Sequence, residues 1–431
     1  MSADGTSSRT WWNAQRLKGA VRQLASVTCI YNPHPNLNQR QTSLRLTVLL
    51  GVLMALPALG TDLFLPALPV LAHALAADVG VAQLTLTTYF VGLAIGQLLW
   101  GPLSDRFGRK PVLLAGLGLL LVSSLAAASM DSVGAVSAAR LVQGLATSSG
   151  AVIVRSIVRD LYAHEQAARL LGSITIVFSI VPIAAPLGGA LLVGRGDWQA
   201  VFWCLALAAA LLIAAAAAGL RETAPIERRS INPLAIARTF ASVLRERQFV
   251  APFLLILCSQ IGILAWVSNS AFTLVSGLGV TVAAYSLMFA AVMLGQISGA
   301  WCSSRLVLRL GMARLLRSGA ALMLAGGTVA AALAWTGVAH WLAVVIPFFA
   351  FLFGSALVMP NATAAALSPF PAAAGSASSL IGAIGFSAGA VVSVALGAAF
   401  DGSARPMAAV AAIAGLAAFT VSRLLWKPST R

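Results

Sequence analysis

Residues 101–110 read Gly-Pro-Leu-Ser-Asp-Arg-Phe-Gly-Arg-Lys, and long apolar runs at 82–103 and 111–130 adjoin this charged stretch. A helix needs about 20 apolar residues to cross a bilayer, and each run is long enough. The stretch therefore predicts a tight turn between two membrane spans. Its glycines and proline also suit a plain turn. Its Asp and Arg side chains favour a charge network that forms in one conformation and breaks in another.

Further apolar runs of similar length occur along the chain and predict an all-α membrane protein with 12 transmembrane helices. An even number of spans places both termini on the same side of the membrane. The predicted limits are 45–67, 82–103, 111–130, 133–154, 170–193, 199–220, 248–274, 283–304, 315–335, 339–360, 374–399 and 405–426.

The composition of the 431 residues agrees with this prediction. Apolar residues make up 59% of the chain and charged residues only 9%, whereas a soluble domain carries about 25% charged residues. A soluble enzyme, a disordered chain and a nucleic-acid-binding domain are therefore disfavoured. The four cysteines are scattered, without a CxxC spacing, so neither a disulfide framework nor a metal site is expected.

The basic residues indicate the orientation. The net charge is +16, and 25 of the 28 Lys and Arg residues fall on one side of the predicted spans. Arg195 and Arg405 fall on the other side, and Arg140 lies inside a span. Because positive charge concentrates in cytoplasmic loops, both termini are expected in the cytoplasm. This bias explains the basic excess without a nucleic-acid partner.

The polar, Arg-rich segment 221–247 divides the spans six and six. We expect a disordered basic arm at 1–44, six-helix halves at 45–220 and 248–426, and a short tail at 427–431. Residues 233–247 are expected to form a helix at the membrane surface. A Gly-Gln pair followed by a basic, Gly-containing turn occurs at Gly96-Gln97 and again at Gly295-Gln296. Such duplicated halves are typical of secondary transporters.

Asp62, in Gly60-Thr-Asp-Leu-Phe-Leu-Pro66, is the one acidic residue well inside a predicted span. An ionised carboxylate in the hydrocarbon region is costly, so Asp62 is expected to face a cavity or to carry a proton. The alternative is a structural carboxyl group that pairs with a helix end or hydroxyl groups. Pro66 and Pro69 are expected to bend or end this helix just beyond the acid.

Arg140 is the only basic residue deep in a span, at a depth similar to that of Asp62, so the two can couple directly or through water. The alternative is that Arg140 reaches the outer headgroups. Against this, Arg140, Gln143, Gly144 and Thr147 recur at helical spacing on one polar face. That face is typical of a cavity wall or a close helix contact.

These stretches resemble a known family. Residues 101–110 resemble the loop signature of the major facilitator superfamily, and Arg140-x-x-Gln143-Gly144 resembles its fourth-helix motif. Residues 182–189 resemble the Pro/Gly motif of the antiporter branch. Across 45–425 the chain resembles bacterial drug:proton antiporters of the bicyclomycin/chloramphenicol-resistance type, most closely at 61–69, 154–160, 360–363 and 374–378.

The resemblance implies the major facilitator fold in the bacterial inner membrane, with a proton as the coupling ion and no other cofactor. It implies that Asp62 is the proton-coupling carboxylate and that Arg140 is the family's functional fourth-helix arginine. The implied conformational gate consists of Gly101, Asp105, Arg106, Gly108 and Arg109. The fourth- and fifth-helix motifs contribute Gln143, Gly144, Pro186, Gly188 and Gly189, although here a single residue, Leu187, separates Pro186 from Gly188.

Candidate substrate contacts follow from the residue types expected in the interior. Aromatic rings can stack on a flat lipophilic compound, and amide side chains can orient it by hydrogen bonds. The aromatic candidates are Tyr89, Phe178, Trp266 and Phe272, and the amide candidates are Gln97, Gln260, Asn269 and Asn361. Phe64, Trp266 and Gly385 differ from the residues that the family commonly carries at these positions. These differences bear on which substrates the protein binds.

The leading hypothesis is a proton-coupled exporter of small lipophilic drugs that acts as a monomer by alternating access. The alternative is an exporter of an endogenous metabolite, such as an amino acid derivative, on the same scaffold. A membrane enzyme is disfavoured because the four His are scattered and no span holds a second acid. The chain also lacks a phosphate-binding Gly-x-x-x-x-Gly-Lys-Ser/Thr motif. A channel is disfavoured by the paired halves.

Overall fold

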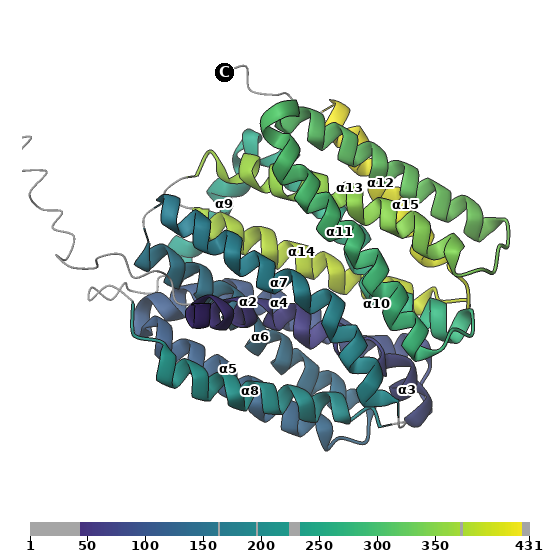
Figure 1. Cartoon of the computed structure of the whole chain (residues 1–431), viewed down its shortest axis with the longest axis horizontal. Helices are drawn as coiled ribbons and strands as arrows, with labels where there is room; N and C mark the ends of the chain where they lie inside the picture. The colour runs from purple at the N-terminus through teal and green to yellow at the C-terminus, as the bar shows by residue number, and fades with distance from the viewer. Residues whose placement is uncertain (1–43, 163, 195–196, 224–232, 371–373, 425–431) are drawn as a thin grey trace, which may run out of the picture. The chain divides into compact units, whose positions relative to one another are not determined.

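The computed structural model describes residues 44–162, 164–194, 197–223, 233–370 and 374–424 (Figure 1). The predicted arm, apart from Leu44, and the predicted tail lie outside the described residues. The helices of the first half are α2 (Leu44–Asp62), α3 (Ala67–Ala74), α4 (Val79–Phe107), α5 (Arg109–Ala128), α6 (Val133–Leu161), α7 (His164–Val193) and α8 (Ala200–Gly219). Those that follow are α9 (Pro233–Arg245), α10 (Arg247–Ala271), the π-helix η1 (Phe272–Gly277), α11 (Val282–Leu310), α12 (Met312–Trp335), α13 (Leu342–Leu367), α14 (Ala374–Ala398) and α15 (Arg405–Leu424).

Twelve helices in the described part of the chain are long and apolar enough to cross a membrane. The predicted number of spans is thereby confirmed, but several predicted limits are wrong. The first span ends at Asp62 rather than at residue 67, and α4, α6 and α11 each extend to 29 residues. Hydropathy detects only the part of a helix that crosses the hydrocarbon core. These helices continue beyond the core for further helical turns that carry polar residues.

Glycines bring the helices of each half into close contact. A Cβ atom on Gly144 of α6 would lie 2.0 Å from the carbonyl oxygen of Tyr89 on α4, and one on Gly92 would lie 2.0 Å from the carbonyl oxygen of Leu141. The second half repeats this device, because a Cβ on Gly319 of α12 would lie 2.6 Å from the carbonyl oxygen of Gly354 on α13. Small residues are a main driver of helix packing in membranes, where lipid competes equally for apolar side chains.

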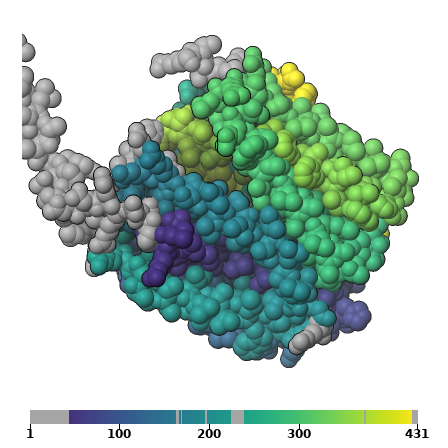
Figure 2. All heavy atoms as spheres, viewed as in Figure 1, coloured from purple at the N-terminus to yellow at the C-terminus, as the bar shows by residue number. Residues whose placement is uncertain are grey.

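The two halves meet through α4 against α14 and α7 against α11. In Figure 2 the yellow-green α14 is visible at the bottom of a recess between the blue-green α7 and the green helices of the second half. We call the end of the bundle that holds the α4–α5, α6–α7 and α11–α12 connections the basic end, because most of the arginines lie there. The predicted surface helix is α9, whose Val243 is fully buried and whose Phe240 packs on the core.

Candidate functional site

Asp62 is the last residue of α2, where a four-residue turn leads into α3. The helix breaks there before Pro66, as the prolines predicted, and the amides of Phe64 and Leu65 bond back to the carbonyl of Thr61. The side chain of Asp62 is 6% exposed and is the only acidic side chain that is buried in the described residues. No hydrogen bond or ion pair of its carboxyl group is found within the described part of the chain.

Glycines of α7 determine how closely this turn is packed. A Cβ atom on Gly189 would lie 2.3 Å from the carbonyl oxygen of Leu63, the residue after Asp62, and one on Gly188 would lie 3.6 Å from the Leu63 side chain. Only a glycine at position 189 allows α7 to reach the backbone beside Asp62. The predicted fifth-helix motif, in which Pro186 lies inside α7, therefore packs directly against the turn that carries the acid.

Arg140 of α6 is fully buried between two aromatic rings. Its guanidinium carbon lies 4.0 Å from the ring centre of Tyr89 and 4.5 Å from that of Phe64. Nη1 donates to the carbonyl of Gly60 at 2.9 Å and to Oε1 of Gln143 at 3.0 Å. A guanidinium that is stacked and hydrogen-bonded in this way is held in one orientation.

Arg140 and Asp62 form no direct ion pair, so the simplest form of the predicted coupling is absent from this conformation. The guanidinium instead binds the backbone two residues before the acid. Its Nε and Nη2 atoms are buried and bond to none of the described residues. A buried charged donor without a partner is costly, so an anionic or polar acceptor that reached this edge of Arg140 in another conformation would be favoured.

A chain of polar side chains continues from Arg140 through the first half. Nε2 of Gln143 donates to Oγ of Ser124 at 2.8 Å. The Tyr89 hydroxyl lies 2.9 Å from both the carbonyl oxygen of Pro57 and the hydroxyl of Thr147. Tyr89, a candidate for stacking on the substrate, therefore covers Arg140 and connects α4 to α2 and α6.

The other candidate substrate contacts fall into separate places. Trp266 is fully buried against Phe289 and Phe348, and Phe272 is fully buried near Phe400. Asn361 of α13 donates to Ser303 of α11 at 2.8 Å, and Asn269 of α10 donates to the carbonyl oxygen of Leu396 on α14 at 3.5 Å, so both amides connect neighbouring helices of the second half. Phe178 is half-buried on α7. These residues lie apart from one another in this conformation, and their contact with a substrate stays a prediction.

Gln97 and Gln260 do approach a common helix, α14. A Cβ on Gly382 would lie 3.1 Å from Oε1 of Gln97, and one on Gly385 would lie 3.3 Å from Nε2 of Gln260. Gln97 comes from the first half and Gln260 from the second. The buried Oε1 of Gln97 accepts no hydrogen bond from the described residues. The glycines of α14 therefore leave room for an amide group from each half.

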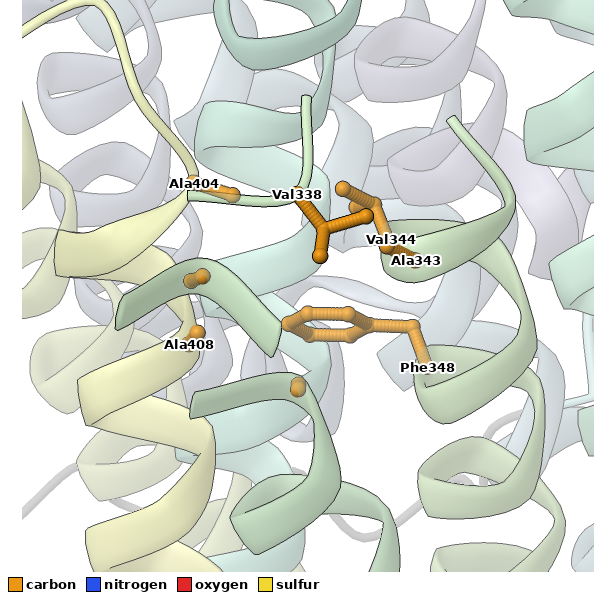
Figure 3. Close-up of a pocket in the computed structure, with 8 residues that line it drawn as sticks. Val338, Ala343, Val344, Phe348, Ala404 and Ala408 are labelled. Atoms are coloured by element: carbon orange, nitrogen blue, oxygen red, sulfur yellow. The ribbon is translucent and has the colours of Figure 1, made fainter. Parts of the chain in front are cut away.

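A small apolar pocket lies elsewhere, between α12, α13 and α15 (Figure 3). Its volume is about 10 Å³, enough for roughly one water molecule. Its lining residues are Ala330, Ala334, Val338, Ala343, Val344, Phe348, Ala404 and Ala408. Because no polar side chain lines it, the pocket offers nothing to orient a drug-sized molecule.

The predicted gate loop is mostly helical, since α4 continues through Asp105 and Arg106 to Phe107 and breaks only at Gly108. Gly108 has φ of +100°, a conformation that favours glycine. The Arg109 side chain is buried and donates to Asp160 at 2.9 Å, to Ser104 at 2.7 Å and to Asp105. Arg106 points away and lies over the Phe107 ring. A Cβ atom added to Gly101 would have Val152 as its nearest neighbour, at 3.9 Å.

Two acidic residues that the sequence analysis did not select complete this network. Asp160 binds Arg109 from the end of α6, and the Glu222 carboxylate accepts the backbone amides of Arg109 at 2.8 Å and Lys110 at 3.2 Å. The network thus joins α4, α5 and α6 of the first half to the start of the segment that follows α8. The sequence signal for Asp160 was its place beside Arg159 at the end of the fourth span.

Among the described residues, two side-chain hydrogen bonds join the halves, and neither was predicted from the sequence. Nη1 of Arg155 on α6 donates to the Ser378 hydroxyl on α14 at 2.9 Å, at the basic end. At the other end, Nε2 of Gln83 on α4 donates to the carbonyl of Ser268 on α10 at 3.0 Å. Because the predicted fourth span ended at residue 154, Arg155 was counted among the loop charges. It lies inside α6 and donates across the interface between the halves.

We expect Ser378→Ala to increase the population of conformations open at the basic end by at least about tenfold, because one hydrogen bond to a charged group is lost and such a bond contributes about 1.5–3 kcal/mol. The measurement is the distance distribution between spin labels at the basic ends of α7 and α11. Ser376→Ala is the control, because the Ser376 hydroxyl makes no bond to the described residues. Equal distributions for both variants would contradict a role of the Arg155–Ser378 contact.

Comparison with known proteins identifies the family. The sequence profile described as "Major Facilitator Superfamily" matches residues 50–394. The chain belongs to the Major Facilitator Superfamily. A bicyclomycin resistance protein homolog of Haemophilus influenzae is 30% identical over 358 residues, which cover 83% of this chain and 89% of that protein. Multidrug resistance protein D of Escherichia coli is 28% identical over 344 residues, with 80% and 86% covered.

Solved structures of this superfamily share the fold. The crystal structure of a D-xylose–proton symporter superposes with a TM-score of 0.69 and covers 89% of this chain and 97% of that chain. Its sequence identity is 15%, so the likeness concerns the fold alone. The expected all-α major facilitator fold is confirmed, and the superfamily consists of transporters rather than enzymes.

Proposed function

We propose that this chain is a drug:proton antiporter, a secondary exporter of small lipophilic compounds that works by alternating access in the bacterial inner membrane. The observation that carries the proposal is Asp62, a buried acid at a helix break within the spans, whose carboxyl group has no hydrogen-bond or ion-pair partner among the described residues. The names of the relatives, a bicyclomycin resistance protein homolog and a multidrug resistance protein, support drugs as the substrate class. The bias of basic residues supports cytoplasmic termini.

Asp62 and Arg140 divide the coupling chemistry in this proposal. Asp62 takes up a proton from outside and releases it to the cytoplasm, since a neutral carboxyl group is less costly in the membrane interior than a charged one. Arg140 shapes the backbone at Gly60, two residues before the acid, and keeps an unused donor edge for the deprotonated carboxylate or for bridging water. The substrate and the proton then exchange as the halves rock about α4 and α14.

The test uses proteoliposomes of the full chain with an imposed pH gradient, acid inside. A panel of lipophilic drugs and amino acid derivatives is added outside, and proton efflux is followed with a dye. We expect selected drugs to trigger efflux in the wild type and Asp62→Asn to reduce this efflux to the rate of empty liposomes. Asp131→Asn is the control, because Asp131 is exposed between α5 and α6.

Each outcome separates the hypotheses. Drug-triggered efflux that survives in Asp62→Asn would move the coupling site to another group. A response to amino acid derivatives but to no drug would replace drug export with metabolite export. Loss in both Asp62→Asn and Asp131→Asn would point to a general effect of charge rather than to Asp62.

A further inference from the structure

The basic ends of the two halves differ in their counter-charges. In the first half, Arg109 has two carboxylate partners, Asp105 and Asp160. In the second half, the sequence contains no acidic residue between Glu246 and Asp401. Arg305, Arg309 and Arg314 lie at the junction of α11 and α12, are all exposed, and take part in no ion pair within the described residues. These three charges therefore have no carboxylate partner among the described residues of their own half.

Large apolar side chains surround the same arginines. Trp301 is 60% exposed, Leu308 93% and Leu310 41%. The Arg305 guanidinium lies 5.4 Å from the Trp301 ring centre. We call Trp301, Arg305, Leu308, Arg309, Leu310 and Arg314 the rim patch. Exposed Trp and Leu beside Arg are typical of a surface that lies in the membrane interface, with apolar groups among acyl chains and charges among headgroups.

The length of α11 places this patch at the headgroups. Its 29 residues span about 43 Å at 1.5 Å per residue, whereas the hydrocarbon core is about 30 Å thick. The final turns, which carry Arg305 and Arg309, therefore extend beyond the core. Guanidinium groups at this depth meet phosphate groups, to which they donate paired hydrogen bonds.

We propose that the rim patch binds the headgroups of anionic phospholipids, which supply the counter-ions that the second half lacks. A free anion would satisfy the arginines but would leave Trp301 and Leu308 in water, whereas a lipid covers both. An arginine near an anionic bilayer surface contributes about 1 kcal/mol. Three of them correspond to a preference for anionic over zwitterionic lipid on the order of 100-fold.

The experiment measures the thermal stability of the purified full chain in detergent micelles with added lipid. Dioleoylphosphatidylglycerol and dioleoylphosphatidylcholine are titrated in parallel, since they share acyl chains and differ in headgroup charge. We expect phosphatidylglycerol to raise the Tm of the wild type and phosphatidylcholine to have little effect. In R305Q/R309Q/R314Q the shift by phosphatidylglycerol should be lost over the same range.

The matched control is R45Q/R169Q/R221Q, which removes two exposed arginines of the first half and one at the start of the segment that follows it, and this variant should keep the shift. The pair R309Q/R314Q is prepared as well, in case the triple variant does not fold. An unchanged shift in the rim variants, or an equal loss in the control, would overturn the proposal. Inorganic phosphate is a further probe, and stabilisation by phosphate alone equal to that by lipid would also overturn it. None of these readouts requires transport, so they are independent of the proposed function.

Discussion

Arg140→Lys is expected to lower the rate of drug-triggered proton exchange by about 100-fold. The guanidinium group of Arg140 stacks on Tyr89 and Phe64 and donates to two acceptors from one nitrogen. A lysine keeps the positive charge but has no planar face, so the stacking with both rings is weakened. A desolvated cation–π contact is worth about 2 kcal/mol and a hydrogen bond to a charged group about 1.5–3 kcal/mol.

The control for this prediction is Arg169→Lys, a matched change at an exposed arginine of α7. Transport is measured in proteoliposomes with the drug that gives the strongest response in the wild type, and Tm is measured alongside. If Arg140→Lys exchanges protons like the wild type, charge alone is sufficient at this position. In that case the orientation of the guanidinium group has no part in the mechanism.

The largest loss of stability is expected for Gly144→Ala. The new Cβ would lie 2.0 Å from the carbonyl oxygen of Tyr89, so α4 and α6 must separate along their contact. Overpacking costs about 1–3 kcal/mol when side chains can adjust, and we expect at least the upper value because the obstacle is backbone. The measurement is the Tm of the detergent-solubilised protein.

Gly134→Ala is the matched control, because Gly134 lies on the same helix with nothing within 4 Å of its Cβ position. The alanine there should leave Tm unchanged or raise it slightly, since alanine favours a helix more than glycine does. Similar Tm values for the two variants would show that α4 and α6 tolerate a wider separation.

The sequence was sufficient to predict the fold because hydropathy reports the property that selects membrane spans. Twelve apolar runs and a basic linker led to twelve spans in two halves. The ends of α4, α6 and α11 were missed because their last helical turns carry polar residues, which hydropathy does not distinguish from a loop. Asp105 was therefore expected in a loop, although the helix continues past it until Gly108 leaves the helical region.

The candidate site was predictable in part. Asp62 and Arg140 were selected because a charge inside a span is rare and costly. The partners of Arg140 were not predictable, since they include the carbonyl of Gly60, a group that every residue carries. The Arg155–Ser378 contact joins residues 223 positions apart, and no local pattern connects them. The candidates for substrate contact were chosen by residue type alone, which does not show which of them are buried in this conformation, as Trp266 and Phe272 are.

The glycines of α14 affect the energy barrier between conformations. At Gly382 and Gly385 the helix presents backbone to Gln97 and Gln260 rather than side chains of its own. When the halves move, α14 can shift along α4 without any rotamer change on this face of α14. The flexible amide side chain of Gln97, which lies across the interface on α4, is then expected to set the barrier. We expect a bulky residue at position 382 to slow the exchange between conformations. The proton-coupling groups Asp62 and Arg140 would stay unchanged.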